Sequence, residues 1–300
     1  MTQLLLLGVL DGLAYASLIF MVAVGLTLIF GVLRVLNVAH GSFYAIGAYT
    51  AASLGLWLAA AGASAWLAFP ALILSAVLVG GLLGAVIERF LLQRIYVREE
   101  VLQLLVTFAV FMILEDVQRL VWGVQPIFVD TPLTLLGLQE VGGIFYTRYQ
   151  LLLLPLTALA VLFGLRFFLR RTLQGRVIVA VTADREAAMA MGINARRVYL
   201  TTFIIGATFA ALGGALASPT TSLVPGIGTQ MIVLSFAVVA TAGLGQVEGA
   251  ALAALLIGLG RSLAVYLYPE FEVLVPYLIM VLVLLVRPQG LFGVAEARPV

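Results

Sequence analysis

The chain has 300 residues, of which 63% are hydrophobic and 10% charged, with a formal net charge of +2 at pH 7. Its mean hydropathy is +1.18. Soluble domains are about half apolar and about a quarter charged, so this composition indicates a bilayer protein and excludes an ordinary soluble domain. The chain has no cysteine, which excludes disulfides and thiol chemistry, and no nucleic acid is expected as a partner.

Nine apolar stretches follow one another, each near the ~20 residues that a helix needs to cross a bilayer. They are apolar all round, which predicts helices rather than a lipid-facing barrel. The first lacks the basic start and cleavage site of a secretory signal, so we expect it to be retained. The sequence predicts an all-α polytopic membrane protein, a single domain over residues 1–300; eight or ten spans also fit, because the seventh and ninth are short. The expected spans are residues 12–33, 39–60, 65–87, 101–122, 150–169, 198–217, 231–244, 249–267 and 273–286.

The stretch "RVLNVAHGSFYAIGAYT", residues 34–50, gathers polar residues and glycines between two apolar segments and contains the only histidine. Polar side chains and helix breaks at membrane depth persist only where protein or water surrounds them. Asn37, His40, Gly41 and Ser42 are therefore candidates for a translocation pathway or a helix break. The alternative is a tight turn in which Asn37 and His40 bond to nearby carbonyls.

Charged residues inside or at the ends of the spans need partners. Glu115 and Arg119 are four apart and are expected to pair on one helix face beside Asp116. A structural or subunit-contact role is the first interpretation of this group, and solute contact the second. Arg261 lies within the eighth span, where an unpaired charge costs several kcal/mol, so it must face the bundle or an interface; its partner is not evident.

The loop of residues 170–197 contains "TADREAAMAMGINARR", which predicts a short helix. Thr182 or Asp184 is suited to cap its start, Gly192 to stop it, and Asn194 to cap the next helix. Such a helix is a shape suited to docking, and an ordinary interfacial helix is the alternative.

All sixteen basic residues are arginines. Threading nine spans places most of them on one face, which the positive-inside rule makes cytoplasmic. The amino terminus is then outside and the carboxyl terminus inside. No internal repeat is evident, which leaves a diverged inverted repeat open. The arginines expected on the cytoplasmic face are Arg34, Arg89, Arg94, Arg98, Arg166, Arg170, Arg171, Arg176, Arg185, Arg196, Arg197, Arg287 and Arg298.

Several kinds of chemistry lack their residues. A P-loop needs a lysine, and the chain has none. Zinc sites need several ligands, and one histidine without cysteine makes a metal site unexpected. The chain also offers no Cys–His pair and no second histidine for nucleophilic catalysis. We therefore expect no enzyme activity, no catalytic residue and no cofactor in this chain.

Three segments resemble LivH-type inner-membrane permeases of branched-chain amino-acid ABC importers. They are "GLTLIFGVLRVLNVAHGSFYAIGAYTAA", "GRVIVAVTADREAAMAMGINARRVYLTTFIIGATFAALGGAL" and the end "LLVRPQGLFG". The wider EAA-x3-G pattern of importers appears as Glu186, Ala187, Ala188 and Gly192, without the Ile-x-Leu-Pro tail. Glu248 in "GLGQVEGA" departs from the glycine-rich turn usual there.

The resemblance implies a permease subunit in a bacterial inner membrane, paired with a second, LivM-like permease. It also implies two cytoplasmic ATPase subunits that bind ATP and magnesium, and an extracytoplasmic solute-binding protein. The short helix would be the coupling helix that docks on the ATPase. The residues implied in coupling are Asp184, Arg185, Glu186, Ala187, Ala188, Met191, Gly192 and Asn194.

A self-sufficient secondary transporter or channel for small polar solutes is the rival interpretation. Such carriers usually place carboxylates in mid-span, whereas the acidic residues here lie mainly at span ends and in loops. The solute itself is open: relatives of this kind carry branched-chain amino acids, urea, short amides, other amino acids or aromatic acids.

Overall fold

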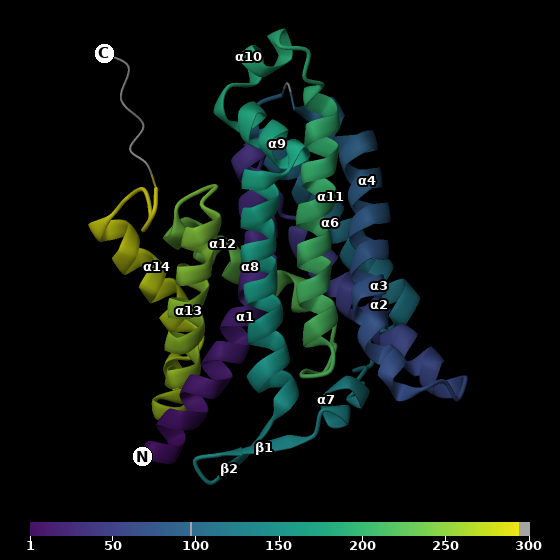
Figure 1. The fold of residues 1–300 in the computed structure, drawn as a ribbon, viewed down its shortest axis with the longest axis vertical. Helices are drawn as coiled ribbons and strands as arrows, with labels where there is room; N and C mark the ends of the chain where they lie inside the picture. The colour runs from purple at the N-terminus through teal and green to yellow at the C-terminus, as the bar shows by residue number, and fades with distance from the viewer. Residues whose placement is uncertain (97, 294–300) are drawn as a thin grey trace.

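The computed structural model describes residues 1–96 and 98–293 and shows a bundle of helices with one β-hairpin (Figure 1). The predicted all-α membrane class is confirmed. Arg298, expected at the cytoplasmic face, lies outside the described residues. The main helices are α1 (Thr2–Leu33), α2 (His40–Ala60), α6 (Glu100–Trp122), α8 (Leu154–Arg171), α11 (Ala195–Ala217), α12 (Ile227–Ala242), α13 (Val247–Leu267) and α14 (Leu274–Val286).

The remaining elements are shorter. The 3₁₀ turn η1, the helices α3 to α5 and the π-helical turns η2 and η3 together form one span, Ala65–Ile95. The short elements are η1 (Ala65–Leu67), α3 (Ala68–Leu78), η2 (Val79–Leu83), α4 (Gly84–Ile87), η3 (Glu88–Leu92), α5 (Gln93–Ile95), α7 (Thr131–Leu135), β1 (Leu138–Val141), β2 (Ile144–Thr147), η4 (Tyr149–Leu153), α9 (Leu173–Ala183), α10 (Arg185–Ala190) and η5 (Pro269–Phe271).

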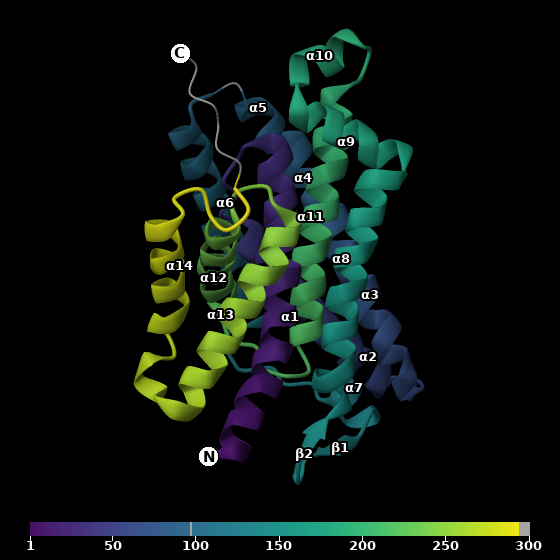
Figure 2. The ribbon, with the colours of Figure 1, turned by 60° about the vertical axis from the view of Figure 1, so that its left-hand side comes forward.

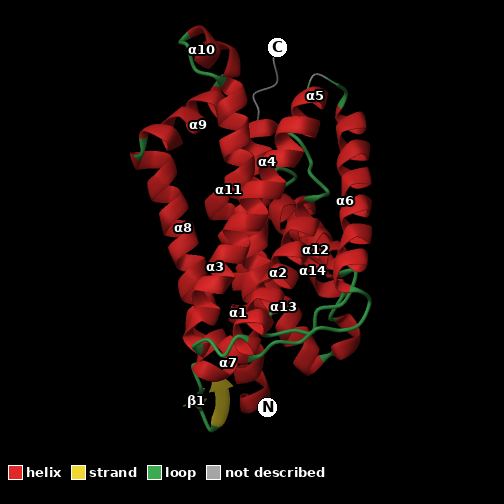
Figure 3. Cartoon of the chain, turned by 90° about the vertical axis from the view of Figure 1, so that its right-hand side faces the viewer, coloured by secondary structure: helices red, strands yellow, loops and turns green. Residues whose placement is uncertain are grey.

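The two ends of the bundle differ in composition. The helices α9 and α10 and the start of α11 lie at one end, here called the arginine-rich end, as Figures 1 and 2 show. The antiparallel hairpin β1–β2, α7 and the amino terminus lie at the other, the hairpin end (Figure 3). Gly142 and Gly143 turn the hairpin with φ of 59° and 82°, the two positive angles of a type I′ turn. The hairpin itself was not predicted.

Six helical segments among the described residues are long and apolar enough to cross a bilayer. Helix α6 has the length of a span but carries charges near its ends, while α9, α12 and α14 are shorter apolar helices. The count of nine spans therefore stays a prediction.

The spans on either side of α8 form two halves with reciprocal packing. Helix α1 runs toward the arginine-rich end, α11 runs away from it, and the two pack along each other. Helix α2 packs on α11, and α12 packs on α1. In the same way, α3 and α4 pack along α11, and α13 packs along α1. Helix α6 contacts α2 as α14 contacts α12. The inverted repeat common in transporters is therefore present in the packing.

The connection from α1 to α2 turns back into the bundle. Helix α1 ends at Leu33, and Arg34 adopts a left-handed φ of 56°. Residues 35–39 then run inward until the ring Nε2 of His40 lies 3.0 Å from the carbonyl oxygen of Val22. By the helical rise per residue, Val22 lies about 16 Å below the end of α1. Helix α2 therefore begins inside the bundle.

Helix α12 also begins inside the bundle, and its first turn touches that of α2. A Cβ atom added to Gly41 would lie 2.4 Å from the carbonyl oxygen of Gly228, and one added to Gly228 would lie 2.8 Å from that of Gly41. The two backbones meet with no room for a side chain. Added bulk at Gly41 would therefore collide with the backbone of α12.

Replacing Gly41 tests this contact. Overpacking costs about 1–3 kcal/mol, so we expect Gly41→Leu to lower the melting temperature and solute uptake more than Ser42→Ala. Gly164→Leu is the matched control, because Gly164 lies in helix α8 with no atom within 4 Å of an added Cβ. Equal melting temperatures for the Gly41 and Gly164 variants would contradict the contact.

Candidate functional site

The four residues of the predicted helix break lie around the start of α2. The His40 ring Nε2–H donates to the Val22 carbonyl, as the alternative interpretation expected. Asn37 and Ser42 are buried, and their side-chain polar atoms have no hydrogen-bond partner within the described residues. Asn37 therefore does not bond a carbonyl as that interpretation required. Solute passage along these residues stays a prediction.

The Thr107 hydroxyl in α6 bonds to the connection between α1 and α2. The Thr107 side chain lies 3.2 Å from the Leu36 carbonyl oxygen and 3.4 Å from the Val38 amide nitrogen. Thr107 is buried, so these bonds replace the water that irregular backbone lacks at this depth. The sequence offered no signal for this role, since threonine is common in membrane helices.

The short helix α10 has the caps that its sequence predicted. The Asp184 carboxylate accepts from the Ala187 amide at 2.9 Å, and the Asn194 side chain accepts from the Arg197 amide at 3.2 Å. Gly192 has a φ of 86°, which favours glycine as a helix stop. Thr182, the other candidate cap, lies in α9.

The faces of α10 differ in exposure. Ala188 is buried against its own chain, whereas Ala187 is exposed and Met191 is 84% exposed. The Arg185 guanidinium lies 5.5 Å from the centre of the Tyr199 ring, which ties α10 to α11. Of the predicted coupling residues, Ala188 therefore supports the helix, while Ala187 and Met191 are accessible at the arginine-rich end.

Three ion pairs link residues that the sequence singled out. Glu248 contacts Arg166 at 3.0 Å and Arg170 at 3.2 Å, so the unusual carboxylate joins the start of α13 to the end of α8. Arg119 contacts Glu115 at 2.7 Å, which confirms the pair expected on one face of α6.

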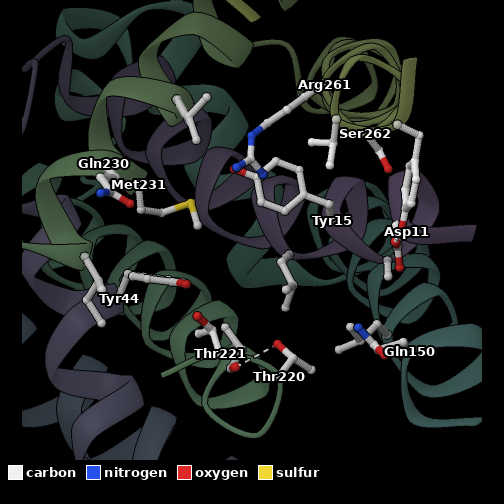
Figure 4. A pocket seen from close by; sticks show the side chains of 18 residues that line it. Asp11, Tyr15, Tyr44, Gln150, Thr220, Thr221, Gln230, Met231, Arg261 and Ser262 are labelled. Carbon is white, nitrogen blue, oxygen red and sulfur yellow. Dashed lines mark hydrogen bonds between the residues drawn. The ribbon is translucent and has the colours of Figure 1, made fainter. Parts of the chain in front are cut away.

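A cavity of about 380 Å³ lies between α1, α12 and α13, in the half of the bundle nearer the hairpin (Figure 4). This volume is at the small end of the roughly 300–1,000 Å³ range typical of small-molecule sites. Its apolar wall includes Leu18, Leu154, Ala217, Met231 and Leu234. The polar residues that line it are Asp11, Tyr15, Tyr44, Gln150, Thr220, Thr221, Gln230, Arg261, Ser262 and Tyr266.

Arg261 in the cavity wall has the carboxylate partner that the sequence required. Its guanidinium bonds to Glu272, which follows η5, and lies 4.2 Å from the centre of the Tyr15 ring. The partner was not evident from the sequence because it is eleven residues away, beyond the turn that reverses the chain.

Asp11, the second charge in the wall, was missed by the sequence analysis. Its carboxylate accepts from the Tyr146 hydroxyl at 2.5 Å and from the Tyr266 hydroxyl. Burial, together with the bond to Asp11, raises the pKa of Tyr146, so that hydroxyl stays protonated and donates. An acidic residue within an apolar helix was the available signal.

These observations define a multi-pass helical membrane protein with a solute-sized cavity between its helices. The profile of the family described as "Branched-chain amino acid transport system / permease component" matches residues 8–284. The chain belongs to this family.

Two relatives and one solved structure show how far the similarity extends. The branched-chain amino acid permease LivH of Salmonella typhimurium is 28% identical, over 97% of this chain and 96% of that protein. LivM of Escherichia coli is 29% identical, over 97% of this chain and 71% of that protein. PsaBC from Streptococcus pneumoniae in complex with Fab is 14% identical with a TM-score of 0.50, covering 94% and 92% of the two chains, which shows the fold alone.

Arg119, paired with Glu115, and Arg261, paired with Glu272, are expected to differ in their effect on stability. Arg119 is 48% exposed, and such pairs contribute about 1 kcal/mol or less. Arg261 is 27% exposed and adds contact with an aromatic ring, worth up to about 2 kcal/mol when desolvated. Arg261→Ala should therefore lower the melting temperature more than Arg119→Ala, and equal melting temperatures would contradict the assigned contacts.

Proposed function

We propose that this chain is the membrane-spanning permease subunit of a binding-protein-dependent ABC importer for branched-chain or related amino acids. Family membership supports the transport role, and α10 is the observation that carries the mechanism. Helix α10 is capped, packs on its own chain through Ala188 and is exposed at Ala187 and Met191. Such a helix suits a docking site for an ATPase subunit. The chain itself contributes no ATPase site and transmits movement through packing.

The proposed assembly contains a second, LivM-like permease and two cytoplasmic ATPase subunits, which bind the ATP and magnesium. An extracytoplasmic binding protein delivers the solute. Helix α6 supports a contact in the bilayer with lipid or a second permease, because it exposes a row of large apolar residues. These include Leu105, Phe108, Met112, Ile113, Leu120 and Val121.

The proposed setting is a bacterial inner membrane, with the arginine-rich end in the cytoplasm. The ends of α1 and α8 and the elements α9, α10 and α11 bring Arg34, Arg170, Arg176 and Arg197 to that end, as the positive-inside rule requires. The amino terminus is then outside and the carboxyl terminus inside.

A second candidate is a self-sufficient secondary transporter or channel for small polar solutes. The meeting of the first turns of α2 and α12 inside the bundle favours it, because carriers often bind solutes at interrupted helices. The two candidates differ in energy source. Uptake that requires ATP inside vesicles supports the importer, whereas uptake driven by an ion gradient without ATP supports the carrier.

The orientation can be tested because the chain has no cysteine of its own. Single cysteines at Gln174 in α9 and Gln139 in β1 occupy exposed positions at opposite ends. We expect an impermeant thiol reagent to label Gln139→Cys but not Gln174→Cys in spheroplasts, whose cytoplasm the reagent cannot enter. Labelling of Gln174→Cys alone would reverse the proposed orientation.

Coupling through α10 can be tested at Ala187. A tryptophan there should obstruct a close helix contact at a cost of about 1–3 kcal/mol, so ATPase stimulation by loaded binding protein should fall roughly tenfold. Stimulation is measured in reconstituted complexes, with Gln174→Trp, an exposed change in α9, as the control.

Ala188→Trp separates docking from folding, because Ala188 is buried in its own chain. We expect it to lower the melting temperature, whereas Ala187→Trp leaves the melting temperature unchanged. Full stimulation and normal uptake with Ala187→Trp would place the docking site elsewhere.

A further inference from the structure

The cavity of Figure 4 combines two opposite charges with an apolar wall. Arg261 from α13 and Asp11 from α1 are labelled on its border, with the Tyr15 ring between them. Leu18, Met231 and Leu234 supply aliphatic surface in the same cavity. Few small solutes match a cation, an anion and an aliphatic wall together.

Both charged side chains keep bonding capacity for a ligand. Arg261 bonds to Glu272 through Nη2, and a guanidinium has five N–H donors in all. Each oxygen of Asp11 accepts one tyrosine hydroxyl, and an ionised carboxylate has about four lone-pair sites. The existing bonds therefore position the two groups without exhausting them.

A third polar group points into the cavity. The Tyr44 side chain is 5% exposed, and Figure 4 shows its hydroxyl directed toward the open space. No hydrogen bond of this hydroxyl occurs among the described residues. A hydroxyl that faces the cavity without a protein partner offers a hydrogen bond to an arriving polar group. Gln230 and Met231, from the start of α12, line the same cavity.

We propose that this cavity binds the solute as a zwitterionic aliphatic amino acid, the α-carboxylate at Arg261 and the α-ammonium at Asp11. The aliphatic side chain lies against Leu18, Met231 and Leu234. This inference rests on the proposed function and adds the binding site and charge form of the solute. Urea, short amides and aromatic acids lack one or both charges, so the cavity disfavours them.

The first test needs no substitution. The full chain in lipid nanodiscs is titrated with L-leucine, with L-leucinamide, which lacks the carboxylate, and with 4-methylpentanoate, which lacks the ammonium group. Leaving one of these partly buried charges without its ligand group weakens binding by about tenfold, so both analogues should bind that much more weakly than leucine by saturation-transfer NMR. Equal binding of the three compounds, or no saturable binding of leucine, would overturn the proposal.

The second test assigns each charge. Arg261→Gln should abolish the preference for leucine over leucinamide, and Asp11→Asn the preference for leucine over 4-methylpentanoate. Arg148→Gln and Glu140→Gln are matched controls, because both residues are exposed at the hairpin end and outside the cavity lining. Arg261→Lys keeps the positive charge and should retain part of the preference. Full discrimination by Arg261→Gln, in protein that melts cooperatively, would refute the assignment.

The outcomes separate this inference from the proposed function. An importer whose Ala187→Trp variant uncouples, but whose wild-type chain does not distinguish leucine from its analogues, retains the function and loses this site. A chain that discriminates the three compounds but transports without ATP retains the site and loses the importer mechanism.

Discussion

The contact between Gly41 and Gly228 is the constraint on which the rest of the architecture depends. Both α2 and α12 begin inside the bundle, where no water satisfies irregular backbone. Their first turns meet at a separation that only glycine permits. A similar close contact between backbones occurs where α1 crosses α11, because a Cβ on Gly25 would lie 2.3 Å from the Gly206 carbonyl oxygen. Bulk at any of these positions separates the two inverted halves.

Each of three charged groups in this fold is bonded by side chains from another element. Glu248 joins α13 to α8 through arginines, and Arg261 is held by a carboxylate beyond η5 and by an aromatic ring in α1. Asp11 is held by hydroxyls from the hairpin and from α13. Arg261 and Asp11 both line the cavity, so the two charged groups that make it polar also join the elements around it. The polarity of the cavity and the packing of the helices therefore depend on the same side chains.

Local patterns predicted local structure well. The caps Asp184 and Asn194 act as expected, and the helix predicted over residues 101–122 differs from α6 by one residue at its start. Depth and direction were not predictable, because apolar composition is the same for a full crossing and for a helix that begins halfway. The span expected from residue 39 is therefore α2, which starts inside the bundle. Asp11 was missed because its partners come from Tyr146 and Tyr266, which no spacing rule connects.

The bond between Tyr146 and Asp11 gives the hairpin a role in the electrostatics of the cavity. The hairpin is largely exposed, yet Tyr146 is buried and donates to the carboxylate that lines the cavity. The Tyr146 hydroxyl shares the negative charge of Asp11 through this bond. Withdrawal of that hydroxyl leaves the carboxylate less stabilised and more attractive to a cation. The position of the hairpin therefore bears on the charge that Asp11 presents to the cavity between the helices.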